Sequence, residues 1–187
     1  MTGKMIALAI AGTIVLPVCA DVVRTDYEPT SIVRQRRHAE EEKGFAPVGS
    51  SFAAFGIAPS LEWPARDFEI MGFRFNLIVG DHVDVYGLDL GVFGNFTRRE
   101  IGGLQLAGLF NVVGESGGAL QVAGLFNNSK GAFSGAQVGL FNIVEEGCGV
   151  QVGVVNRAYG LSGVQIGVVN VIENSPVSFF PLVNFSF

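Results

Sequence analysis

A short phrase that recurs through the second half of the sequence constrains this chain more than any other feature. The phrase is Gly-x-Gln-x-Gly-x-x-Asn, and residues 149–156, Gly-Val-Gln-Val-Gly-Val-Val-Asn, are one copy of it. Successive Asn residues of the series lie 16, 16, 15, 14, 14 and 14 positions apart. A fixed motif at so short a period is typical of repeat architectures, in which each copy forms one structural unit.

The recurring amide side chains are the candidate structural positions of this repeat. The Asn positions are Asn95, Asn111, Asn127, Asn142, Asn156, Asn170 and Asn184. The Gln positions are Gln105, Gln121, Gln137, Gln151 and Gln165. An earlier variant carries Asp89 in place of Gln, and a degenerate copy that ends at Asn184 closes the series. Gly72 precedes Gly87 by 15 residues, so the Gly72 segment is expected to be a worn early copy.

The residues within a unit alternate in character, which predicts an all-β chain. Val150, Val152 and Val154 share one face of an extended strand, whereas Gln151 and Gly153 share the other. One architecture that this allows is a β-solenoid-like stack of 14–16-residue units. Identical residues of neighbouring coils would then lie about 4.8 Å apart. Stacked Asn and Gln side chains would form amide ladders, and the recurring Gly would mark a bend or a close approach of backbones.

A small antiparallel outer-membrane β-barrel is the alternative architecture. Each unit would be one strand of about 10 residues, and the chain ends on Phe185-Ser186-Phe187, which resembles the terminal aromatic signature of such barrels. We favour the solenoid, because a recurring Asn on a lipid-facing surface would be costly. Identical copies are also expected where every unit occupies the same environment.

The repeated phrase, together with Pro181-Leu182-Val183-Asn184 and the terminal aromatic, resembles that of the bacterial surface-repeat proteins. The resemblance covers about residues 68–187. It implies an exported protein of the bacterial envelope or cell surface, and it carries over no catalytic residue.

The first 44 residues differ from the repeat region and predict two further segments. Residues 1–20 have the pattern of a signal peptide, with Lys4 before an apolar run and Ala20 at the expected cleavage site. Cys19 as the acylated residue of a lipoprotein is the alternative. Residues 21–44 are rich in charge and predict a solvated linker, which leaves 45–187 as the β repeat domain.

The composition and the scattered polar residues give little support for chemistry. The net charge is −5, and no basic patch with interleaved aromatics suggests nucleic acid. Asp81-His82-Val83-Asp84 could hold a metal, but a polar turn explains it as well, and Glu145-Glu146 is more typical of a solvated corner. We therefore expect no enzyme activity, no cofactor, no metal and no small-molecule substrate.

The expected function is that of a structural or interaction repeat protein of the bacterial envelope or cell surface. Outer-membrane or other envelope components are the expected partners, and the periplasm is the alternative location. The barrel alternative would make the chain an anchor or a narrow channel. A third possibility is an adhesin-type binding module that uses a stacked aromatic face, made of Phe93, Phe110, Phe126 and Phe141.

Overall fold

The computed structural model describes residues 47–187, and every regular element in this range is a β-strand. The predicted signal peptide and charged linker lie outside the described residues. The strands are β1 (Gly49–Gly56), β2 (Glu62–Trp63), β3 (Phe68–Asn76), β4 (Val79–His82), β5 (Asp84–Gly91), β6 (Gly94–Thr97), β7 (Glu100–Ala107), β8 (Phe110–Val113), β9 (Ser116–Ala123), β10 (Phe126–Val138), β11 (Phe141–Val152), β12 (Val155–Ile172) and β13 (Phe179–Ser186).

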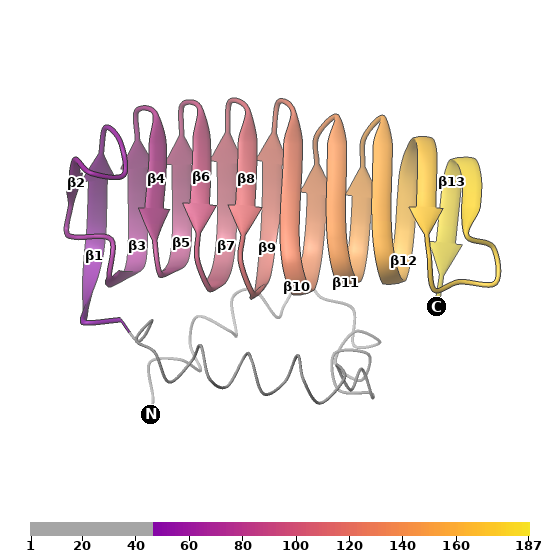
Figure 1. Cartoon of the computed structure of the whole chain (residues 1–187), viewed down its shortest axis with the longest axis horizontal. Coiled ribbons are helices and arrows are strands. Elements are labelled where there is room, and N and C mark those ends of the chain that lie inside the picture. The colour runs from indigo at the N-terminus through magenta and orange to yellow at the C-terminus, as the bar shows by residue number, and fades with distance from the viewer. Residues whose placement is uncertain (1–46) are drawn as a thin grey trace.

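The strands form a β-solenoid with two long sides, as Figure 1 shows. One side, the Gln side, stacks β3, β5, β7 and β9 and continues into the second halves of β10, β11 and β12. The other, the Asn side, stacks β4, β6 and β8 and continues into the first halves of β10, β11 and β12. All of these neighbours pair in parallel, one coil upon the next. The solenoid prediction is confirmed, and the antiparallel barrel alternative is wrong.

Equivalent residues of successive repeats pair with one another in the structure. Gln137 pairs with Gln121 and with Gln151, and Asn142 pairs with Asn156. The Gly72 segment belongs to the first of these coils: Phe73 pairs with Leu88, so Gly72 precedes Gly87 in the stack.

A column of glycines on the Gln side shows why the motif needs Gly two residues before Gln. Gly149 has a φ of 137°, in the region that side chains other than Gly rarely adopt. A Cβ placed there would lie 1.9 Å from the carbonyl oxygen of Gly135 in the preceding coil. The expected close approach of backbones is therefore confirmed at this position.

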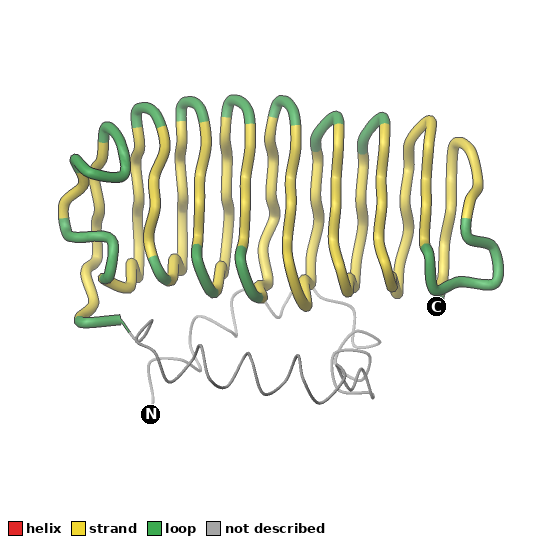
Figure 2. The backbone as a smooth tube through the Cα atoms, in the orientation of Figure 1, coloured by secondary structure: helices red, strands yellow, loops and turns green. Residues whose placement is uncertain are grey.

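The coils become tighter along the chain. Six positions separate Gln105 from Asn111, but only five separate Gln137 from Asn142. The turn after each Gln strand thus loses one residue, and the opposite turn loses one in the last coils. Figure 2 shows the result, because loops occupy both ends of the early coils whereas strands run through the lower turns of the late ones.

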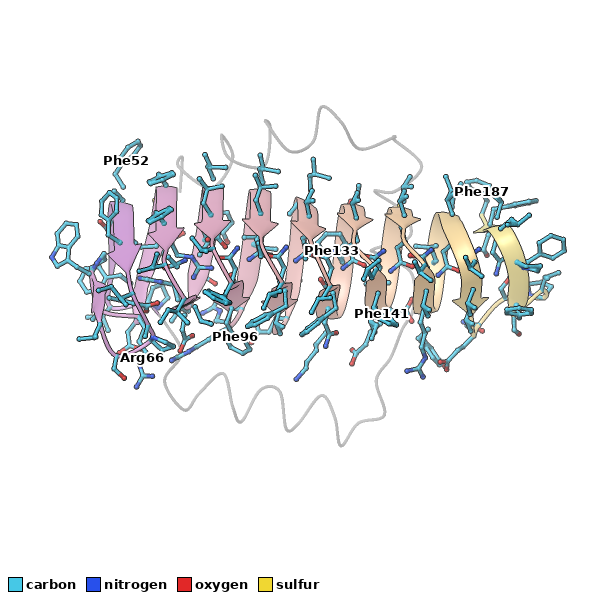
Figure 3. All side chains as sticks on the ribbon, turned by 90° about the horizontal axis from the view of Figure 1, so that it is seen from above. Phe52, Arg66, Phe96, Phe133, Phe141 and Phe187 are labelled. Atoms are coloured by element: carbon cyan, nitrogen blue, oxygen red, sulfur yellow. The ribbon has the colours of Figure 1, made fainter. Side chains whose placement is uncertain are left out.

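The interior between the two sides is divided into an apolar half and an amide half. The apolar core contains Ile70, Val85, Ile101, Val144 and Ile172, all at most 3 % exposed. Large and small residues alternate within it: Phe133 lies between Gly117 of one neighbouring coil and Gly147 of the other. In Figure 3 the Phe133 side chain lies between the two sheets, whereas that of Phe141 projects outward.

Both ends of the described stack are closed by antiparallel pairing. β2 pairs with β1 at the first end. At the other end β13 turns back along β12 and pairs Asn184 with Gln165. Proline suits an edge strand because it has no N–H to donate to a further neighbour, and β13 contains Pro181. The sequence prediction that the final unit ends the stack agrees with this arrangement.

Candidate functional site

A ladder of glutamine side chains runs through the interior of the Gln side. Each Gln donates from Nε2 to Oε1 of the Gln in the preceding coil, at 2.8 Å in every step from Gln165 to Gln105. Gln105 then donates to Oδ2 of Asp89, also at 2.8 Å. An ionised carboxylate only accepts hydrogen bonds. Asp89 therefore fixes the direction of the whole ladder.

A second ladder, made of asparagines, runs in the opposite direction. Each Asn donates from Nδ2 to Oδ1 of the Asn in the next coil, as from Asn142 to Asn156 at 2.8 Å. The same amide group also donates to the backbone carbonyl of Val152, which belongs to the coil of Asn156. Donation to a backbone carbonyl fixes which atom of the amide faces it. The predicted amide ladders therefore exist. The motif Asn residues from Asn95 to Asn170 and the motif Gln residues from Gln105 to Gln165 are all buried.

The two ends of the Asn ladder depart from the sequence prediction. At the first end Gly80 occupies the Asn position, and Asn76 from the opposite strand reaches across to donate to Asn95 at 3.3 Å. A Cβ on Gly80 would collide with that amide, at 2.0 Å from Nδ2. Asn184 was expected to extend the ladder at the other end, and this is wrong, because antiparallel β13 places it opposite Gln165.

Sequence reasoning missed a buried ionic cluster beneath the first end of the Gln ladder. Arg74 is fully buried and donates to both carboxylate oxygens of Asp89, at 2.7 and 2.6 Å. It also donates to the carbonyl of Phe96 at 3.1 Å. The sequence did contain a sign of this cluster. Arg74 and Asp89 both stand where the motif has Gln, and they are 15 residues apart, which is the length of one coil.

Two further ionisable side chains are buried beside Arg74. Glu62 Oε2 lies 3.8 Å from His82 Nδ1. Burial raises the pKa of Glu62 to about 7, against the opposing effect of the Asp81 backbone N–H. Burial, with the Arg74 guanidinium, lowers the pKa of His82 to about 4. Near neutral pH the histidine is thus uncharged, and the Glu62 carboxyl is close to its midpoint of titration.

The side chains of this cluster are closed off from solvent. The side chains of Arg74, Asp89 and His82 are fully buried, and that of Glu62 is 1 % exposed. A substrate would have no direct access to these groups. Within residues 47–187 no group of three or more His, Cys, Asp or Glu side chains is placed to hold a metal ion. Asp81, which the sequence offered as a metal ligand, instead accepts two hydrogen bonds from Arg98, at 2.9 and 2.7 Å.

The outer surface of the turns between the Gln and Asn sides forms a continuous apolar ridge. The tip of this ridge is one stacked row in which every side chain is 37–60 % exposed. The row consists of Phe93, Leu109, Leu125, Leu140, Val154 and Val168. One flank of the ridge is the row of Leu90, Leu106, Val122, Val138, Val152 and Ile166. The other flank is the row of Phe110, Phe126, Phe141, Val155 and Val169.

The backbone at the ridge tip is hydrogen-bonded from coil to coil. The N–H of Leu125 donates to the carbonyl of Leu109 at 2.8 Å, and the N–H of Val154 donates to that of Leu140 at 2.9 Å. Because these polar groups are satisfied internally, the outside of the ridge presents mainly hydrocarbon. The aliphatic face predicted from the repeat is therefore on the outside, and the amide face is on the inside.

The opposite turns form a charged edge. It carries Arg98, Arg99, Glu115, Lys130, Glu145, Glu146, Arg157 and Glu173. Arg157 donates to Glu173 across one coil, with Nε 2.7 Å from Oε1. The ridge turns are at the top of Figure 1 and the charged turns at the bottom, so the ridge and the charged edge lie on opposite edges of the coils. Within the described residues no helix is long and apolar enough to cross a membrane.

The expected stack of four phenylalanines exists only in part. Phe110 and Phe126 stack with ring centroids 5.4 Å apart and planes at 12°. Phe141 follows Phe126 in register. Phe93 is not in this row, because Gly94 pairs with Phe110 and places Phe93 in the tip row instead. The aromatic surface is thus one part of the apolar ridge.

Comparison with known proteins adds no family to this description. No protein-family model, no curated protein and no solved structure matches the chain.

Proposed function

We propose that this chain is a non-enzymatic structural or interaction protein of the bacterial envelope or cell surface, and that its apolar ridge is the interaction surface. The observation that carries the proposal is the separation of the apolar ridge from the charged edge on a rigid stack. Ordinary monomeric proteins rarely expose a large continuous apolar surface, and those that do commonly use it for association. The predicted signal peptide supports the location.

The amide interior supports a role as a scaffold. Two hydrogen-bonded ladders hold consecutive coils in register, so the side chains of the ridge form straight rows that do not depend on a flexible loop. A binding surface on rigid elements keeps its shape without an ordering cost when a partner arrives. The buried ionic cluster fits the same role, since it closes one end of the Gln ladder.

The proposal is tested by making the ridge polar without disturbing the interior. The variant Leu109→Ser, Leu125→Ser and Leu140→Ser replaces three exposed side chains of the tip row. Its matched control, Glu115→Ser, Lys130→Ser and Glu145→Ser, changes three side chains on the charged edge. The ridge variant should keep the β-rich circular dichroism spectrum but leave the envelope fraction of the cells. The control should remain in it. Equal retention of both variants would contradict the proposal.

A further inference from the structure

We infer that the occupant of the apolar ridge is one leaflet of a lipid membrane, into which the coils insert edge-on. This inference rests on the proposed function and names the partner of the same surface. It concerns the ridge as defined above, with Leu125 near the middle of its tip row.

The first argument is that backbone N–H groups in the middle of the ridge are already hydrogen-bonded within the protein. Polar groups that enter hydrocarbon are tolerated only where they are hydrogen-bonded within the protein. The turn N–H of Leu125 bonds to the carbonyl of Leu109, and that of Phe141 bonds to the carbonyl of Leu125, both at 2.8 Å. Asn127 Nδ2 donates to the carbonyl of Val138, at 2.9 Å, from inside the coil. Hydrocarbon contact therefore costs no hydrogen bond at these groups.

The second argument is shape. The ridge is convex, because its rows continue from the Gln side over the turn to the Asn side. A second copy that met it tip to tip would contact it along one row of side chains, far less than the roughly 1,200–2,000 Å² that stable protein interfaces bury. A fluid leaflet, in contrast, adapts to a convex apolar edge and can cover the tip and both flanks at once.

The third argument is depth and charge. The flank row that contains Val138 precedes the tip row that contains Leu140 by two residues, which span at most about 7 Å. Elements that lie in one leaflet bury their apolar surface about 5–10 Å deep. The three rows of the ridge contain only Leu, Val, Ile and Phe. The neighbouring coils place Lys130 and Glu145 on the charged edge, away from the leaflet. Insertion should therefore need no anionic lipid.

The test uses tryptophan as a probe of lipid contact in the full-length chain. Trp63 is the single tryptophan, so Trp63→Phe gives a silent background. Leu125→Trp then reports on the ridge, and Tyr159→Trp reports on an exposed position at the charged edge. Each protein is mixed with phosphatidylcholine vesicles whose acyl chains are brominated, because bromine quenches tryptophan only on close approach. Plain phosphatidylcholine vesicles serve as the reference.

We expect the Leu125→Trp protein to lose most of its fluorescence in brominated vesicles, and to do so equally at low and high salt. The Tyr159→Trp protein should keep its intensity even though the same vesicles bind it. The site-specific comparison matters because the predicted apolar signal segment could itself bind vesicles.

Three outcomes would overturn the inference. Equal quenching of both probes would mean unspecific adsorption. An unquenched ridge probe in a chain that light scattering shows to be dimeric would assign the ridge to a second copy. An unquenched ridge probe in a monomer would assign it to another envelope partner if the triple-Ser ridge variant still leaves the envelope fraction. If that variant stays in the envelope, the proposed function falls as well.

Discussion

The first coils and the last coils of the solenoid have the same backbone path, but different polar residues are buried in their interiors. In the coils of β10, β11 and β12 the buried polar residues repeat as Gln over Gln and Asn over Asn. In the coils of β3 and β5 the corresponding places hold Arg74 and Asp89, and Gly80 replaces an Asn. The last coils thus use identical neutral amides, whereas the first coils use charged side chains.

The direction of the ladders explains this difference. Every Gln donates toward the first end, so the last donor, Gln105, needs a partner that accepts only, and Asp89 is one. A buried carboxylate needs compensation in turn, which the bidentate Arg74 provides. At the other end the ladder finishes in an acceptor, and Gln165 Oε1 is buried without a partner. Asn76 Oδ1, at the start of the opposite ladder, is unpaired in the same way.

Removal of the closing strand should have the largest effect on this comparison. Truncation after Asn174 deletes β13 and exposes the edge of β12 from Gly163 to Val171. An open apolar strand edge pairs readily with other chains. We expect aggregation in size-exclusion chromatography with light scattering, whereas the control Phe187→Ser should stay monomeric with a modest loss of stability. A truncated chain that remains monomeric and equally stable would show that β13 is only a tail.

Breaking the ionic cluster should have the next largest effect. Arg74→Met leaves the Asp89 carboxylate buried and uncompensated, and we expect the free energy of unfolding to fall by about 3–5 kcal/mol. The matched control, Arg157→Met, breaks the exposed pair with Glu173 and should cost at most about 1 kcal/mol. Denaturant unfolding measures both. Similar losses in the two variants would contradict a special role for the first end.

Replacement of the charges by amides tests whether the two interiors are interchangeable. The double variant Arg74→Gln with Asp89→Gln extends the Gln ladder by two rungs and buries no charge. It should recover most of the stability that Arg74→Met loses, because a buried ion pair commonly adds little over a neutral replacement. A double variant as unstable as the single one in the same denaturant series would show that the first end requires the ions.

The Gln and Asn ladders, the stacked coils and the closing end could be predicted from the sequence, because each depends on a residue that repeats at a fixed position. It was harder to predict which face of each strand points into the interior. Alternation separates Val150 and Val152 from Gln151, but apolar rows suggest an interior, and here the amides occupy it. Hydrogen bonding between copies makes that inversion possible, and no single copy contains this information.

The exceptions at the first end could not be predicted for a related reason. Asn76 completes the Asn ladder from the opposite strand, so its position in the motif does not indicate its role. Glu62 reaches His82 from β2, which pairs antiparallel with β1 and has no counterpart in the repeat. Asn184 keeps the motif but lies in a reversed strand. Sequence periodicity fails wherever the chain leaves the repeated path.

Loss of one rung should have an intermediate effect in the middle of the stack. Asn142→Ala removes the partner of both Asn127 and Asn156 and the donor to the carbonyl of Val152. We expect a loss of about 1–3 kcal/mol in the free energy of unfolding, the usual cost of unpaired buried polar groups. Asn184→Ala should cost less, because Asn184 makes no ladder bond. Equal and negligible losses in denaturant melts would remove the ladders from the account of stability.

The smallest expected effect is a pH dependence that belongs to the first end alone. The pKa of Glu62 is raised from 4.5 to about 7 in the folded chain, so its contribution to stability is full below pH 4.5 and is lost as the pH rises to about 7. The pKa of His82 is lowered from 6.5 to about 4, so its contribution is full above pH 6.5 and is lost as the pH falls to about 4. The two contributions oppose each other between these limits.

Glu62→Gln leaves only the contribution of His82, so the stability of this variant relative to the parent should increase as the pH rises from 4.5 to 7. Denaturant midpoints measured between pH 4 and 8 give this difference, in which groups elsewhere cancel. A profile for Glu62→Gln that runs parallel to that of the parent would mean that burial does not shift the pKa of Glu62.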